Sequence, residues 1–276
     1  MTQDKAQTLA SEGTARPRPR RIKGGEPSMM VRVVLPIVAF ALTLVMWEVV
    51  VRGLDIKQYI LPAPSVVYER FVQVIPSLWD AALVTGSEVL LGFVLAAVVS
   101  IPLAYLIASV RVIEIAFYPL IVVLQTIPKI AVAPLIIVWF GFGMMPKVLL
   151  TFLLCFFPIL VDTLTGFKAL DPRLLYITKS MGASGLQTFA YVRMPAAMPF
   201  IFSGLKVAVV LAVTGAIVAE FVGSNAGLGY LLLRASANLD TPLIFSVLVV
   251  LSLLGLLFAY VVELAERLVT PWQRKH

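Results

Sequence analysis

The sequence has almost no cysteine or histidine, the side chains on which disulfides and many metal and catalytic sites depend. It contains one cysteine, Cys155, and one histidine, His276. These cannot form a disulfide framework or a His/Cys metal site, and Cys155, within an apolar run, is expected to pack as a small apolar side chain. The Gly-x-x-x-x-Gly-Lys-Ser/Thr loop that cradles nucleotide phosphates is also absent. We therefore expect no enzymatic activity and no cofactor in this chain. If ATP drives the protein, another subunit must hydrolyse it.

Charged residues are also scarce, while apolar residues are abundant. Only 13% of residues are charged, 60% are hydrophobic, and the mean hydropathy is +0.98. Soluble domains contain roughly 45–50% apolar residues, and a spanning helix needs about 20 in succession. The sequence therefore predicts an all-α, polytopic membrane protein with six transmembrane helices, over residues 31–51, 83–109, 116–140, 148–167, 200–222 and 243–264. Residues 1–30, rich in Pro and Arg, are predicted to form a disordered cytoplasmic tail, and residues 31–276 a transmembrane domain.

The positive residues give the expected orientation. They gather in the N-terminal tail, in the loop at residues 168–198 and at the C-terminus, and six spans place all three regions on one side. Because Lys and Arg are retained on the cytoplasmic side, both termini and this loop are predicted to be cytoplasmic, and residues 223–242 external. The net charge of +7 is explained by this rule. No basic stripe interleaved with aromatics predicts a nucleic-acid partner.

The loop at residues 168–198 has the pattern of a capped helical hairpin. Asp171 is a predicted N-cap with Pro172 after it, and Gly182 is placed to end the helix. Ser184 and Gln187 have capping-box spacing for a second helix. That helix is expected to end in a final turn containing Arg193, before Pro195.

The first helix of this hairpin is predicted to be amphipathic. Leu174, Ile177 and Met181 share one face, which can dock on another protein. The alternative is an ordinary well-capped cytoplasmic loop.

The same loop carries a recognisable spacing: Gly182, nine residues, Val192, one residue, then Met194-Pro195. This resembles the cytoplasmic signature of ATP-binding-cassette (ABC) importer permeases, Glu-Ala-Ala, three residues, Gly, nine residues, Ile, one residue, Leu-Pro. Tyr176-Ile177-Thr178 stand in place of Glu-Ala-Ala. Over residues 61–272 the chain is similar to the branch that imports nitrate, sulfonates, taurine and pyrimidine vitamin precursors, with the motifs at residues 125–135, 139–143, 156–159, 220–223 and 227–230.

The resemblance implies a permease subunit of the bacterial inner membrane that works by alternating access. Its implied partners are a second permease copy, two cytoplasmic ATPase subunits and an external solute-binding protein. The residues implied to couple the permease to the ATPase are Leu174, Ile177, Met181, Gly182, Ala183, Ser184, Val192 and Pro195. An ion-coupled secondary carrier or channel is the alternative, and it would need no ATPase. An intramembrane enzyme is disfavoured because the spans hold no catalytic constellation.

Charges within the predicted spans are candidates for the solute path, because each costs about 2.5–3.5 kcal/mol at the bilayer centre on insertion scales. Lys129 lies near the middle of the third predicted span. It is expected either to pair with Glu88 or Glu220, which we prefer, or to meet an anionic solute. Glu220 is the candidate outer gate, and Asp162 and Lys206 are expected to be interfacial anchors.

The same predicted spans contain a regular row of small residues and several prolines. Gly204, Ala208, Ala212 and Ala216 recur every four residues, so another helix can approach closely, either within the subunit or across a dimer interface. Prolines are expected to kink or interrupt helices, namely Pro102, Pro119, Pro128, Pro134 and Pro158.

Overall fold

The computed structural model describes residues 29–273, with side chains from residue 34. The predicted disordered tail therefore lies almost entirely outside the described residues. The chain divides into two compact units, residues 1–47 and 48–276. The described part of the first unit is one helix, which continues into the second unit as far as Gly53. The second unit contains all the other elements.

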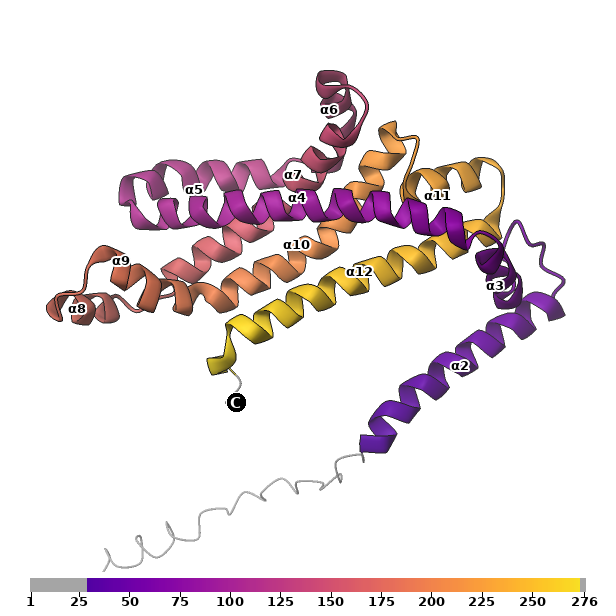
Figure 1. The fold of residues 1–276 in the computed structure, drawn as a ribbon, viewed down its shortest axis with the longest axis horizontal. Helices are drawn as coiled ribbons and strands as arrows, with labels where there is room; N and C mark the ends of the chain where they lie inside the picture. The colour runs from indigo at the N-terminus through magenta and orange to yellow at the C-terminus, as the bar shows by residue number, and fades with distance from the viewer. Residues whose placement is uncertain (1–28, 274–276) are drawn as a thin grey trace, which may run out of the picture. The chain divides into compact units, whose positions relative to one another are not determined.

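Every element between residues 29 and 273 is helical, as predicted (Figure 1). The elements are α2 (Met29–Gly53), α3 (Pro64–Gln73), α4 (Ile75–Ser109), α5 (Arg111–Thr126), the 3-10 turn η1 (Lys129–Val132), α6 (Ala133–Phe140), α7 (Met144–Lys168), α8 (Pro172–Ser180), α9 (Gly185–Thr188), the π-helical turn η2 (Phe189–Arg193), α10 (Met194–Gly223), α11 (Leu228–Ala237), α12 (Thr241–Val269) and the 3-10 turn η3 (Pro271–Gln273).

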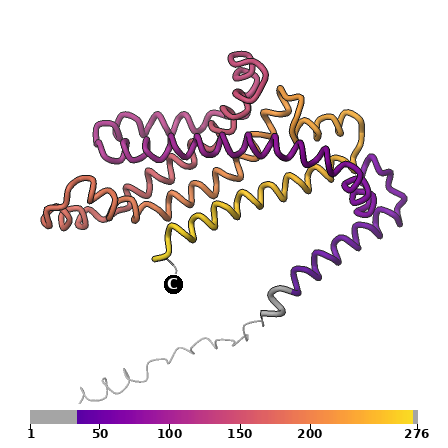
Figure 2. The backbone as a smooth tube through the Cα atoms, viewed as in Figure 1, coloured from indigo at the N-terminus to yellow at the C-terminus, as the bar shows by residue number. Residues whose placement is uncertain are grey.

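Five helices in this part of the chain are long and apolar enough to span a membrane, and a bent helix pair makes a sixth. The bent pair contains the third predicted span, residues 116–140, and has the interruption predicted at Pro128. It breaks after Thr126, and its two halves meet at 81° (Figure 2). Pro128 explains the break, because proline lacks the N–H that would continue the helical ladder and disfavours a helical residue before it. Pro102, Pro119 and Pro158 lie inside continuous helices.

The centre of the second unit is formed by α4, α7 and α10. Ala208, Ala212 and Ala216 of α10 are fully buried and pack against Cys155 and Ile159 of α7. The small-residue row therefore serves helix packing within this chain, which is one of the two alternatives left open by the sequence. Cys155 is packed as a small apolar residue, as expected.

Thr151 of α7 shows how close the three central helices are. A Cβ on Gly92 of α4 would lie 2.5 Å from the Thr151 side chain, and one on Gly215 of α10 would lie 3.0 Å from its Cα. Glycine at these two positions thus permits the close approach of α4 and α10 to α7.

The capped hairpin lies at one end of this bundle. Figure 1 shows α8 and α9 at the same end as the connection between α4 and α5, while α3 and α11 lie at the opposite end. Arg193 of η2 donates a hydrogen bond to the Ser109 hydroxyl at 3.4 Å, which ties the two connections together. Lys206, predicted as an interfacial anchor, forms an ion pair with Glu266 of α12 at 2.5 Å.

Candidate functional site

The first helix of the hairpin is capped as the sequence predicted. The Asp171 carboxylate accepts a hydrogen bond from the Arg173 backbone N–H at 2.8 Å, and Pro172 follows as the first helical residue. The helix ends at Ser180, and Gly182 has φ = +76°, a left-handed conformation that favours glycine. These local interactions fix the elbow between α8 and α9.

The second helix of the hairpin starts as predicted but does not end there. The Ser184 hydroxyl accepts from the Gln187 N–H, and the Gln187 side chain accepts from the Ser184 N–H, forming the expected capping box. The predicted stop at Pro195 is wrong, because α9 continues through η2 into α10. The wider π-helical turn places the Met194 N–H against the carbonyl of Phe189, and Pro195, which has no N–H, follows where the helix returns from the π to the α hydrogen-bond register.

The apolar face of α8 is exposed. Leu174, Ile177 and Met181 are 45%, 55% and 80% exposed. Ala183 and Val192 are half-buried, and Pro195 likewise. Two further apolar side chains at this end, Leu186 and Tyr191, are about four-fifths exposed, at 78% and 80%. They lie outside the predicted coupling residues, because the amphipathic pattern of the sequence is confined to the first helix. A large exposed apolar patch on an ordered, capped element is typical of an interaction surface.

A buried polar cluster lies where α4, α7, α10 and α11 meet. Glu88 and Glu220 are 0% and 1% exposed. Lys147 of α7 donates a hydrogen bond to Glu88 at 2.7 Å, so the partner of Glu88 is Lys147 and the predicted pair with Lys129 is wrong. The second oxygen of Glu88, Oε2, has no hydrogen-bond partner among the side chains that the structure describes.

Glu220 uses both carboxylate oxygens within this cluster. One accepts from the Thr85 hydroxyl at 2.6 Å, and the other accepts from the Gly229 backbone N–H at 2.5 Å. The Thr85 hydroxyl in turn accepts from the Leu228 N–H at 2.8 Å. The carboxylate therefore holds the first turn of α11 against α4 and α10. Thr85 and Lys147 were not predicted from the sequence, since a lysine at the start of an apolar run resembles an interfacial anchor.

Glycine is required where the chain passes Glu220. Gly227 has φ = +104°, and a Cβ there would lie 2.0 Å from a Glu220 oxygen. Beside the cluster is a cavity of about 710 Å³, which Lys147 lines together with Phe142, Ser224 and Asn225. The candidate outer gate is thus a tightly packed polar junction next to an open space.

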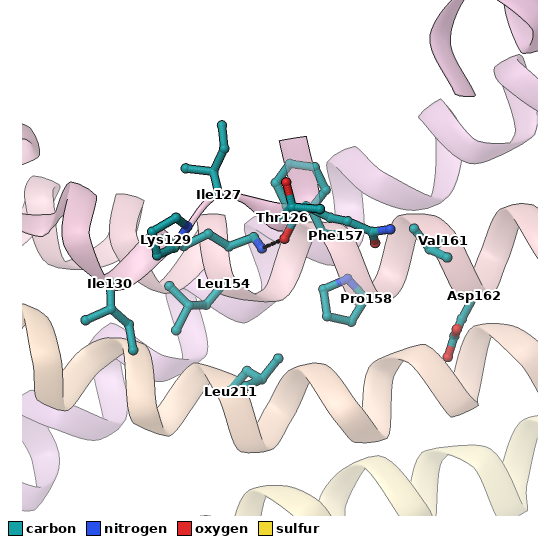
Figure 3. Close-up of a pocket in the computed structure, with 12 residues that line it drawn as sticks. Thr126, Ile127, Lys129, Ile130, Leu154, Phe157, Pro158, Val161, Asp162 and Leu211 are labelled. Atoms are coloured by element: carbon teal, nitrogen blue, oxygen red, sulfur yellow. Dashed lines mark hydrogen bonds between the residues drawn. The ribbon is translucent and has the colours of Figure 1, made fainter. Parts of the chain in front are cut away.

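Lys129 lies in a different place, at the break between α5 and α6. It lines a cavity of about 620 Å³ formed by η1, α7 and α10 (Figure 3). Its ammonium donates a hydrogen bond to the Gln125 carbonyl at 2.9 Å and lies 4.8 Å from the centre of the Phe157 ring. No ion pair between residues 34 and 273 includes Lys129, so the preferred pairing with Glu88 or Glu220 is corrected.

The described residues thus form a helical bundle with spans of membrane length, one of them broken at Pro128 beside a cavity. Residues 100–275 match the family model for the binding-protein-dependent transport system inner membrane component. The chain belongs to this family. It is a multi-pass permease subunit of an ABC importer and not an enzyme, and the alternative of an ion-coupled carrier is wrong.

Curated relatives agree with this family. The chain is 37% identical to the formylaminopyrimidine transport permease ThiX of Halalkalibacterium halodurans, over 87% of this chain and 96% of that protein. It is 40% identical to the riboflavin transport permease RibX of Chloroflexus aurantiacus, over 86% and 89%, and 30% identical to the putative aliphatic sulfonates permease SsuC of Bacillus subtilis, over 86% of each.

The fold is similar to a permease chain of the MetNI methionine ABC transporter in an inward-facing crystal structure. The TM-score is 0.56 at 19% identity, and the match covers 71% of this chain and 96% of that chain. At this identity the similarity shows the fold.

Proposed function

We propose that two copies of this chain form the translocation path of a bacterial importer driven by two cytoplasmic ATPase subunits and supplied by an external solute-binding protein. Both termini and the hairpin would face the cytoplasm. The observation that carries this proposal is the capped hairpin with Leu174, Ile177 and Met181 exposed. A rigid apolar surface at the end of the bundle can transmit closure of the ATPase pair to the spans.

The proposed coupling surface comprises the hairpin residues named from the resemblance, together with Leu186 and Tyr191. Gly182, Ala183 and Ser184 form its elbow, while Val192 and Pro195 connect it to α10. Because α9 runs into α10 without a break, motion of the hairpin is expected to move α10 and hence Glu220. This gives the coupling surface a direct connection to the candidate outer gate.

The solute is proposed to be small and polar. The relatives carry names that include formylaminopyrimidine, riboflavin and aliphatic sulfonates. The cavity at Lys129, of about 620 Å³, is within the size range of small-molecule sites. We assign Lys129 to the solute path, and Glu88 and Glu220 to the outer gate.

The coupling proposal is tested by co-purification of the ATPase subunit with permease variants. Ile177→Asp and Met181→Asp place a charge on the apolar face and are expected to abolish co-purification and uptake, while membrane insertion stays normal. Ser180→Asp adds the same charge to α8 outside the face and serves as the matched control. Undiminished ATPase binding and uptake in both face variants would refute the proposal.

The orientation is tested by cysteine labelling in a Cys155→Ala background. A membrane-impermeant maleimide should label Asn225→Cys in intact cells and Ser184→Cys only after the membrane is opened. Labelling of Ser184→Cys in intact cells would reverse the orientation and remove the ATPase contact.

A further inference from the structure

The cavity at Lys129 carries two charges of opposite sign. Lys129 lies on η1, and Asp162 lies on α7, at the far side of Pro158 in Figure 3. The wall between them is apolar and aromatic and is formed by Leu154, Phe157, Pro158, Val161 and Leu211. A site for an anion alone would use Lys129, but the Asp162 carboxylate would have no binding partner in it.

Neither of these charges is neutralised by an ion pair within the part of the chain that the structure describes. Several other charges of the spanning helices are paired, including Glu88 with Lys147 at 2.7 Å and Lys206 with Glu266 at 2.5 Å. A charge held within a membrane protein without a counter-charge is costly and marks substrate or ion paths. Lys129 and Asp162 are thus two charges of opposite sign that line one cavity without an ion pair in the described residues.

The donors and acceptors left over in the cavity define the ligand. An ammonium has three donors, and Lys129 uses one of them on the Gln125 carbonyl, so two remain for an anionic group. An ionised carboxylate only accepts hydrogen bonds, so Asp162 is matched by an amino group. The apolar wall between the two charges suits a short hydrocarbon or ring segment.

We propose that this cavity binds a small zwitterion, with its sulfonate or carboxylate on Lys129 and its amino group on Asp162. The assignment of Asp162 as a specificity-determining residue rests on the proposed function, because it treats the cavity as part of the solute path. It replaces the expectation that Asp162 is an interfacial anchor. It also explains why a lysine and an aspartate line the same cavity without pairing elsewhere.

The test uses three probes that differ by one group each: taurine, which is a zwitterion, ethanesulfonate, which lacks the amine, and ethylamine, which lacks the sulfonate. Each probe is titrated against the purified full-length permease, and affinity is read from the shift of its thermal unfolding midpoint. The wild type is expected to bind taurine at least about tenfold more tightly than either analogue, a difference of about 1.4 kcal/mol, because each analogue lacks one of the two charged contacts.

Substitutions separate the two contacts. Asp162→Asn should reduce taurine affinity to that for ethanesulfonate, and Lys129→Met should abolish the response to both sulfonates. Asp162→Glu and Lys129→Arg keep the charges and should retain the preference for taurine. Lys206→Met removes a lysine outside the cavity and should leave the ratio of affinities unchanged.

Two results would overturn the proposal: equal affinity of the wild type for taurine and ethanesulfonate, or an unchanged preference in Asp162→Asn. The Ile177→Asp variant distinguishes these failures from failure of the proposed function. It is expected to lose ATPase binding while keeping the preference for taurine. Normal ATPase coupling with no such preference refutes the zwitterion site alone, whereas the preference without any ATPase capture by the wild type refutes the proposed coupling.

Discussion

Two lysines within the membrane part of this protein have opposite surroundings. Lys147 is buried, pairs with Glu88 at 2.7 Å and belongs to a cluster in which Glu220 binds the first turn of α11. Lys129 lines a cavity, and its ammonium donates to a backbone carbonyl of the preceding turn. The comparison shows that the position of a charge along a span does not determine whether it is paired. Pairing depends on whether helix packing brings a counter-charge to it.

The geometry of the spans explains the difference. At Lys147, α4, α7 and α10 are in close contact, so side chains from separate helices reach one another. At Lys129, the break after Thr126 turns α6 away by 81°, and a cavity opens beside α7. The break at Pro128 therefore leaves Lys129 beside a cavity, whereas Lys147 lies within the packed helices.

The comparison is tested most strongly by Lys147→Met. Removing one partner of a buried ion pair leaves an uncompensated charge and is expected to lower stability by about 3–5 kcal/mol. Folded yield and resistance to SDS unfolding measure the loss. The double variant Lys147→Met/Glu88→Gln should recover most of it, and a double variant as unstable as the single one would contradict the pairing.

Gly227→Ala should have the next largest effect. The positive φ of Gly227 disfavours any side chain, and the alanine Cβ would lie 2.0 Å from a Glu220 oxygen, so the backbone and the carboxylate must move apart. Backbone strain of this kind costs about 1–3 kcal/mol, to be measured in the same unfolding assay. Gly185→Ala is the control, since a Cβ there meets nothing within 4 Å. Equal stability of the two variants would argue against a tight junction at Glu220.

Thr85→Val should destabilise the protein by about 1–2 kcal/mol, because the Leu228 N–H and one Glu220 oxygen each lose a hydrogen-bond partner. The variant keeps the shape of the side chain, so the loss reports the hydroxyl alone. Thr214→Val is the matched control, as the exposed Thr214 hydroxyl bonds to a carbonyl of its own helix. A Thr214→Val protein that is less stable than Thr85→Val would contradict this prediction.

Lys129→Met should have the smallest effect on stability. With no ion pair to break, the change in unfolding free energy is expected to stay within about 0.5 kcal/mol, while solute uptake is lost. Adding Glu88→Gln or Glu220→Gln should rescue nothing. A large loss of folded yield in Lys129→Met would show that this lysine is structural and would remove the contrast with Lys147.

The features predicted correctly from the sequence depend on neighbours along the chain. The N-cap at Asp171, the left-handed Gly182 and the capping box at Ser184 each involve residues two or three positions apart, so local pattern suffices. The partner of Glu88 is 59 residues away, and its identity depends on how α4 and α7 pack. Hydropathy identified the spans, and Pro128 predicted an interruption of the third one, but neither carries information on the angle of 81° between its halves.

The π-helical turn at residues 189–193 was also missed, because a single wide turn leaves no signature in hydropathy or capping residues. Its consequence concerns rotational phase. Residues 185–223 form one helix of 39 residues in which this turn inserts one residue into the α-helical repeat. Deleting that residue would rotate everything before it by about 100° around the helix axis, since an α-helix has about 3.6 residues per turn. The azimuth at which Leu186 is presented, relative to Glu220 at the other end of the helix, is therefore set by the length of this one turn.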